Sequence, residues 1–148
     1  MDPKIEVSIV PTEHIDTFWR QIEPLLKPAA DRSHGRYLVE DIYDSIIQYD
    51  SQCWVAHHSG IIVGAAVSHQ VFYPRKTVLV VAFWGGAEPL EDWGEALLNI
   101  IQRYAKEIGC DAVEAQARMG WSKRIKDYGY KKAFDVFELP IDPISPNN

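Results

Sequence analysis

Apolar side chains recur along the first third of the chain at the spacings of a strand and of two helices. Residues 5–9 alternate between apolar and polar side chains, which predicts a short strand. The next apolar residues recur at helical spacing from about residue 12 to residue 28, and Thr12 is the expected N-cap. We expect Pro24 and Pro28 to bend or end this helix, because proline cannot donate a backbone hydrogen bond. Residues 38–49 predict a second helix after a polar stretch.

Three strands are predicted to follow one another in the middle of the chain. The segments 53–57 and 61–73 flank a His-Ser-Gly turn, as in a hairpin, and Gly64 is expected to mark a bulge in the second of them. The third segment, 77–84, is nearly all apolar. Such a run is typical of a central strand that is buried on both faces.

The last third of the chain predicts two helices that alternate with two strands. The longest helical pattern spans 89–108, where Pro89 suits the first turn and Gly109 follows the end. We expect a strand at 112–117, a short helix at 122–128, a strand at 132–139 and a frayed tail at 141–148. The long helix is predicted to bury one face, formed by Trp93, Leu97, Ile100, Ile101, Tyr104 and Ile108.

These elements give the order β-α-α-β-β-β-α-β-α-β, which predicts one α/β (α+β) domain over residues 1–140. A buried strand, a long helix and another strand imply a right-handed crossover between parallel strands, whereas the preceding hairpins imply antiparallel pairing. The expected architecture is therefore a mixed central sheet with helices on both faces. The segments 77–84 and 112–117 should be parallel neighbours.

Composition and charge exclude several classes of function. The 148 residues carry a formal net charge of −6, which makes nucleic acid an unexpected partner. No window approaches the length of a membrane span, and the first residues lack the pattern of a signal peptide. The two cysteines, Cys53 and Cys110, are expected to be reduced and buried, and no Cys/His spacing forms a metal site. We therefore expect a cytoplasmic protein without a metal.

The element order resembles that of the GNAT (N-acetyltransferase) superfamily over nearly the whole chain. Within it, the tryptophan and glycine motifs are most similar to GNAT-like proteins encoded by tailed phages and prophages, which implies a host-cytoplasm or virion setting. The motifs are Ser33-His34-Gly35-Arg36, Glu40-Asp41-Ile42, Gln52-Cys53-Trp54-Val55-Ala56, Tyr73-Pro74, Trp84-Gly85-Gly86, Trp93, Gly109-Cys110, Arg118-Met119-Gly120-Trp121 and Gly129-Tyr130.

The resemblance implies an acetyl-CoA site between the fourth and fifth strands and at the start of the following helix. Backbone N–H groups at such a helix start attract the pyrophosphate. The residues that would hold the cofactor here are Phe83, Trp84, Gly85, Gly86, Gly94 and Ala96.

The match to this cofactor site is incomplete at the helix start. Glu91 stands where the resemblance expects Gln or Arg, and Glu88, Asp92 and Glu95 add three more carboxylates. These charges would repel a phosphate. Pro89 also predicts that the helix starts earlier and leaves Gly94 in its interior.

The catalytic residues that the resemblance implies are also replaced. Ile125 stands four residues before Gly129, where many GNAT enzymes carry the tyrosine that protonates the thiolate, and Tyr128 is the nearest substitute. The segment 77–84 contains no glutamate for a general base, and His69 on the preceding strand is the best substitute because imidazole titrates near neutrality. Both residues have structural alternatives, a core aromatic and a strand histidine.

Two hypotheses of function follow. In the first, the fold is a degenerate acetyl-CoA-dependent N-acyltransferase that serves as a protein-binding or virion-associated module. In the second, it is an active N-acetyltransferase that transfers an acetyl group from acetyl-CoA to a small amine or a protein lysine. The missing tyrosine, the missing base and the acidic helix start favour the first.

Overall fold

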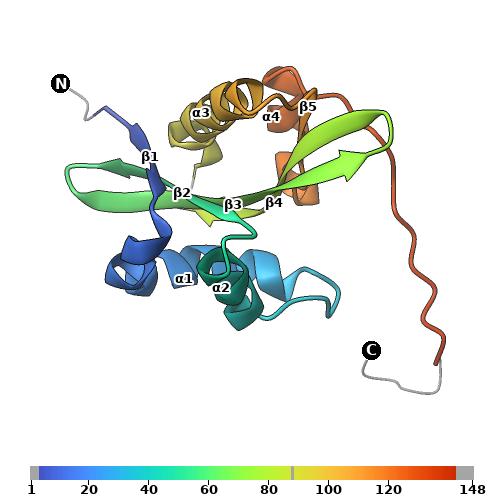
Figure 1. Ribbon diagram of the computed structural model, residues 1–148, viewed down its shortest axis with the longest axis horizontal. Coiled ribbons are helices and arrows are strands. Elements are labelled where there is room, and N and C mark those ends of the chain that lie inside the picture. Colours follow the sequence, from blue (N-terminus) through green and yellow to red (C-terminus); the bar gives the residue numbers. More distant parts are fainter. Residues whose placement is uncertain (1–3, 88, 143–148) are drawn as a thin grey trace.

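A five-stranded sheet with two helical layers forms the body of the protein (Figure 1). The computed structural model describes residues 4–87 and 89–142. The sheet has the order β1-β2-β3-β4-β5. Its strands are β1 (Glu6–Val10), β2 (Gln52–His58), β3 (Ile61–Tyr73), β4 (Lys76–Gly86) and β5 (Ala112–Ala115).

The first four strands pair antiparallel, and β5 joins β4 in parallel. The parallel pair confirms the crossover that the sequence predicts between 77–84 and 112–117. A register shift leaves Val63 unmatched between β2 and β3, next to Gly64, where the sequence predicts a bulge. The predicted α/β class and the mixed sheet are therefore confirmed.

The α1/α2 face of the sheet is covered by two helices that precede β2, α1 (Ile15–Asp31) and α2 (Val39–Ile47) (Figure 1). Of the two alternatives predicted for Pro24 and Pro28, an end of the first helix is wrong, because α1 continues through both prolines to Asp31. It begins after a 3-10 turn, Thr12–His14, in which Thr12 makes no side-chain cap. The core of this face is formed by Val10, Ile15, Ile22, Leu26, Ala30, Val39, Ile42, Ile46, Cys53, Val55, Ala65 and Val67.

The opposite, α3 face is covered by α3 (Gly94–Glu107) and the short α4 (Ser122–Asp127) (Figure 1). Leu97 and Ile101 are fully buried, as predicted, and Leu98 joins them; Ile100 and Tyr104 are half-buried at the edge of the same core. The prediction is wrong for Ile108, which follows the end of α3 and is exposed. Tryptophans distinguish this core from the first, because Trp54, Trp84, Trp93 and Trp121 all belong to it.

Two predictions for the last third of the chain are wrong, one about where a helix begins and one about a strand. The predicted helix 89–108 is a 3-10 turn, Leu90–Asp92, followed by α3, which begins at Gly94. The predicted strand 132–139 is not formed: the segment is extended and exposed, and it pairs with no strand of the part of the chain that the structure describes. Of the expected tail 141–148, residues 143–148 lie outside the described residues.

Candidate functional site

The end of β4 turns away from β5 and leaves a gap between the two strands. Their ladder runs from Val78 opposite Ala112 to Val81 opposite Ala115, and the Gln116 N–H still donates to the Val81 carbonyl oxygen at 3.0 Å. The next residue, Ala82, is a bulge, because β3 pairs with Val81 and then with Phe83. A bulge bends the strand that carries it, so the parallel pairing stops here.

Three indole rings fill this gap on the α3 face of the sheet. Trp84 comes from β4, Trp93 precedes α3, and Trp121 precedes α4. The ring centroids of Trp84 and Trp121 are 4.7 Å apart, and those of Trp84 and Trp93 are 6.1 Å apart. The three side chains are at most 6% exposed. We refer to Trp84, Trp93 and Trp121 as the indole cluster.

Hydrogen bonds fix two members of the indole cluster in place. Trp84 Nε1 donates to the carbonyl oxygen of Gln116, just beyond β5, at 2.8 Å. Trp93 Nε1 donates to the carbonyl oxygen of Ala87 in the β4–α3 connection. The Trp84 bond spans the two diverging strands, so this indole closes the gap at its narrow end.

The glycines near the gap make room for neighbouring groups of the protein itself. A Cβ atom at Gly64 would lie 2.4 Å from the Trp93 ring, and one at Gly86 would lie 2.8 Å from it. A Cβ atom at Gly85 would lie 2.3 Å from the Leu25 carbonyl oxygen in α1. These contacts are too short for any side chain. Packing of the indole cluster and of α1 therefore accounts for the predicted cofactor residues Gly85 and Gly86.

Gly94, the predicted phosphate-binding glycine, is the first residue of α3 and not an interior residue as the sequence predicts. The N-terminal position is the one that binds anions in other helices. However, Gly94 is buried, and a Cβ atom there would lie 2.6 Å from Leu90 Cδ1. The Leu90 side chain therefore covers this glycine, while Ala96, two residues further on, is half-buried.

The charge at the start of α3 is only partly compensated. Glu91, Asp92 and Glu95 are all exposed there, and Glu88 lies outside the described residues. Arg124 of α4 approaches Glu91 at 3.6 Å, with both side chains about half exposed. An exposed pair of this kind contributes little, and two further carboxylates remain. The helix start does not fit a pyrophosphate.

His69 and Tyr128, the two predicted catalytic residues, lie on opposite faces of the sheet. His69 lines a cavity next to α2, whereas Tyr128 packs against the core under α3. The Tyr128 hydroxyl is buried and has no hydrogen-bond partner among the described residues. Burial raises its pKa, and the nearby Glu95 charge adds to this effect. The structure does not bring these two residues together.

The surroundings of His69 favour the protonation state that a base needs. Burial lowers the pKa of His69, and the charge of Glu114 on β5 opposes this effect. His69 pairs with Val80, which in turn pairs with Glu114, so the three residues form one row across the sheet. Burial thus favours the neutral imidazole, which can accept a proton.

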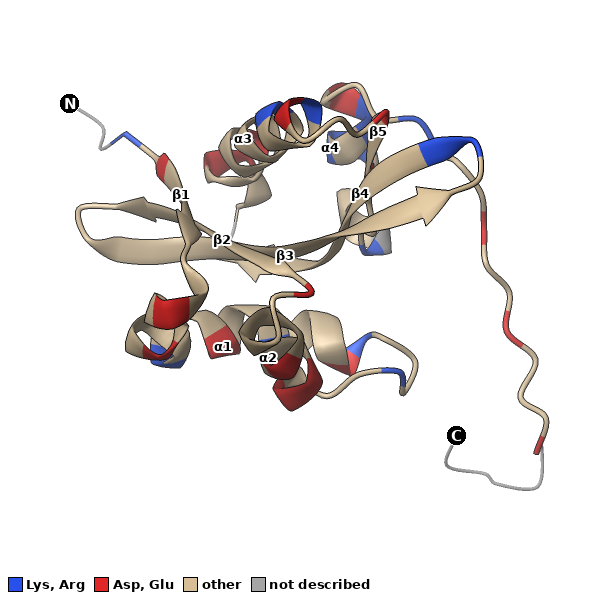
Figure 2. Cartoon of the chain, viewed as in Figure 1, with Lys and Arg blue, Asp and Glu red and all other residues tan. Residues whose placement is uncertain are grey.

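The cavity that contains His69 has a volume of about 390 Å³ and lies between α2, β3 and β4. The Tyr37 and Phe83 rings meet edge to face at 5.0 Å on one side of it. Helix α2 itself carries three carboxylates and no basic residue (Figure 2). We refer to this space as the α2 cavity. It is lined by Tyr37, Asp41, Ile42, Ser45, Asp50, Ser51, His69, Gln70 and Phe83.

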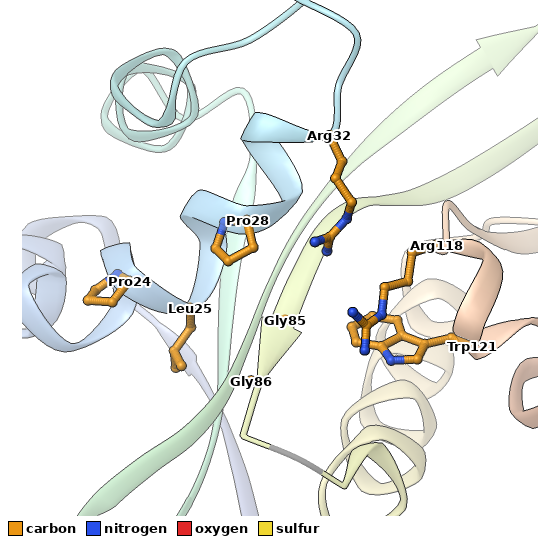
Figure 3. Close-up of a pocket in the computed structure, with 8 residues that line it drawn as sticks. All are labelled: Pro24, Leu25, Pro28, Arg32, Gly85, Gly86, Arg118 and Trp121. Carbon is orange, nitrogen blue, oxygen red and sulfur yellow. The ribbon is translucent and has the colours of Figure 1, made fainter.

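A second cavity, of about 180 Å³, lies at the open side of the gap between β4 and β5. Arg32 at the end of α1 and Arg118 beyond β5 extend into it from opposite sides (Figure 3). The Arg118 guanidinium stacks over the Trp121 ring at 4.8 Å. The rest of the lining is Pro24, Leu25, Pro28, Gly85, Gly86 and Trp121. Sequence reasoning missed Arg32 as a site residue, because its position depends on how α1 crosses the sheet.

Comparisons with known proteins identify the fold. No family model and no curated protein matches the sequence. Among solved structures, aminoglycoside N-acetyltransferase AAC(6')-Iy in complex with CoA is 16% identical, with a TM-score of 0.69 over 96% of this chain and 97% of that one. A ribosomal-protein-alanine N-acetyltransferase from Brucella melitensis biovar Abortus 2308 is also 16% identical, with a TM-score of 0.65 over 93% and 98%.

An aminoglycoside acetyltransferase from an uncultured soil metagenomic sample, in complex with sisomicin, is 14% identical and has a TM-score of 0.68 over 93% of this chain and 97% of that one. The chain has the fold of the GNAT acetyltransferases. Likeness at this level of identity establishes the fold, and function has to be argued from the residues of the site.

The GNAT fold carries no metal cluster and no membrane helix in the described part of this chain. No group of three or more His, Cys, Asp or Glu side chains within residues 4–87 and 89–142 is arranged to hold a metal ion. No helix among those residues is long and apolar enough to cross a bilayer.

Proposed function

We propose that this protein uses the GNAT fold as a protein-binding module and does not transfer acetyl groups. The observation that carries this proposal is the indole cluster in the gap between β4 and β5. The family resemblance assigns that gap to the pantetheine arm of acetyl-CoA. Here Trp84 bridges it to Gln116, and its side chain is 2% exposed. A cofactor would have to break this hydrogen bond and displace packed aromatic rings.

The residues around the gap support the same conclusion. Ile125, which replaces the expected tyrosine, is buried and cannot donate a proton. Leu90 covers Gly94 at the start of α3. A base at His69 and an acid at Tyr128 would act from opposite faces of the sheet. The side chains that the reaction needs for cofactor binding, proton removal and proton donation are therefore either missing or not arranged together.

An active N-acetyltransferase is the second candidate, and two observations favour it. The bulge at Ala82 and the divergence of β4 and β5 preserve the backbone geometry that the resemblance requires. The α2 cavity combines Asp41 and Asp50 with two aromatic rings, a lining that suits a cationic amine. In this hypothesis the neutral His69 would accept the proton of the amine, and the arginine-lined cavity would face the acyl donor.

Calorimetric titration with acetyl-CoA decides between the two. We expect no measurable binding to the unmodified protein at micromolar concentration. Trp121→Ala, which removes one indole of the cluster, should allow weak binding, and Glu91→Arg in addition should strengthen it by replacing a repulsive charge. Submicromolar binding by the unmodified protein, followed by CoA release with an amine, would establish the enzyme instead.

The setting and the partner belong to the same proposal. The resemblance to GNAT-like proteins of tailed phages supports a role in the host cytoplasm or within the virion, in contact with another protein. Mass spectrometry of purified particles, compared with the soluble fraction of infected cells, tests this setting. Absence of the chain from the particles would remove the virion-associated role.

A further inference from the structure

Strand β5 leaves one edge of the central sheet open. The sheet order places β5 last, with β4 as its one partner among the described strands. The Gln116 N–H donates to Val81 of β4, and alternate residues of a strand direct their backbone groups to opposite sides. Val113 and Ala115 therefore direct theirs to the open edge. Such an edge is a template for another strand.

The segment 132–139 has the sequence of a strand and lacks a partner strand. Its residues, KAFDVFEL, carry apolar side chains at both odd and even positions, as a strand covered on both faces requires. Yet Phe134, Val136, Phe137 and Leu139 are 64%, 73%, 90% and 82% exposed. Isolated exposed apolar residues are ordinary, but four large ones gathered within six positions mark an interaction site.

The segment leaves the core in a direction away from the β5 of its own chain. Tyr130 is held in the core, where its hydroxyl accepts a hydrogen bond from Gln102 at 3.1 Å. From there the chain runs past the sheet toward the side of α1 and α2 (Figure 1). Arg36 pairs with Glu138 at its far end, and both side chains are 48% exposed, so this contact holds the segment weakly.

We propose that segment 132–139 pairs with the open edge of β5 in a second copy of the chain, and that two copies exchange these segments reciprocally. One chain supplies both halves of the contact, an open edge and an unpaired strand, which is the condition for a two-fold symmetric dimer. The charges agree, because Lys132 begins the segment directly after Lys131, and Glu114 lies in β5. The proposal is independent of whether acetyl-CoA binds.

The test is the oligomeric state of the full chain, measured by size-exclusion chromatography with light scattering over a range of concentrations. We expect a dimer. Adjacent prolines, Val136→Pro with Phe137→Pro, remove one outward N–H whatever the register, and should give a monomer. Ala115→Pro should do the same from the β5 side. Phe137→Tyr is the matched control, because it keeps the backbone donor, and should stay dimeric.

Mixing the two monomeric variants separates exchange from other contacts. The Ala115→Pro chain retains its segment and the double-proline chain retains its edge, so a mixed dimer keeps one of two pairings and should re-form in part. Hydrogen exchange gives a readout without mutation: the amides of 133–138 should be protected at high concentration and exchange on dilution. A monomeric unmodified protein, or a dimer that survives both variants, would overturn the proposal.

Discussion

Trp84 Nε1 donates a 2.8 Å hydrogen bond to the main-chain oxygen of Gln116, which joins β4 and β5 beyond the end of their ladder. The two strands have already diverged there, because Ala82 is bulged. A side chain thus spans the distance that backbone pairing no longer covers. The same bond holds β4 to the end of β5 and keeps the Trp84 ring in the gap between them.

Trp84→Phe tests the structural part of this relationship. Phenylalanine keeps an aromatic ring in the cluster but leaves the Gln116 oxygen without its donor, which should cost about 1–3 kcal/mol of unfolding free energy together with a packing loss. Urea unfolding measures it. Trp19→Phe is the control, since Trp19 donates to the half-buried Glu23 carboxylate one turn along α1, within a single helix, and joins no two strands. Equal losses in the two variants would contradict the prediction.

Leu97→Ala tests the core of the α3 face. Leu97 is 0% exposed among the aromatic rings and strands of that core. Its truncation should cost about 2–5 kcal/mol through lost burial and the cavity left behind. Asn99→Ala, on the exposed side of the same helix, should change stability by less than about 0.5 kcal/mol. Comparable denaturation midpoints for both would show that the buried face is wrongly assigned.

Gly85→Ala tests the close approach of α1 to β4. The added methyl group would meet the Leu25 carbonyl oxygen at 2.3 Å, and both partners are backbone, so helix and strand must separate. We expect a loss of about 1–3 kcal/mol, as for other overpacked sites. Gly120→Ala is the matched control, because no atom lies within 4 Å of the new methyl group. A thermal melt that ranks the two variants in the opposite order would refute the contact.

Because of His69, the folded protein should lose stability in mild acid. Burial lowers the pKa of His69 from its ordinary 6.5 in the folded chain. The unfolded chain therefore binds the proton first, and the free energy of unfolding should fall as the pH drops below about 6.5. His69→Gln should flatten this dependence, whereas Glu114→Gln should steepen it by removing the opposing charge. The measurement is urea unfolding between pH 5 and 8 in the three proteins, and identical profiles would exclude the effect.

The two cysteines should differ in reactivity. Burial raises the pKa of the Cys53 thiol to about 12, whereas Cys110 is half-buried. Because the thiolate is the reactive form, a thiol reagent at pH 8 should label Cys110 in the native protein and Cys53 only after unfolding. Cys110→Ser should abolish the native reaction, and Cys53→Ser should leave it unchanged. Rapid labelling of the Cys110→Ser variant would contradict the burial of Cys53.

The sequence by itself determined the order of the elements from β1 to α4 and most of the residues that α3 buries. Helical spacing placed Leu97 and Ile101 in the core, and the apolar run 77–84 predicted the central strand. These features depend on residues close together in the chain, where spacing alone sets which side chains share a face. The sequence also showed that Glu91 and Ile125 differ from the residues that the GNAT resemblance expects, because both stand at positions that a motif defines.

Tertiary structure alone decided what fills the gap and which residues meet. Trp84, Trp93 and Trp121 are up to 37 positions apart in sequence, and no local pattern indicates that their rings touch across diverging strands. The predicted site residues His69 and Tyr128 were separated by the sheet for the same reason. Segment 132–139 has the sequence pattern of a strand but forms none. A strand forms only where a neighbouring strand edge supplies hydrogen bonds. Whether such an edge lies beside the segment depends on the rest of the chain or on a second chain.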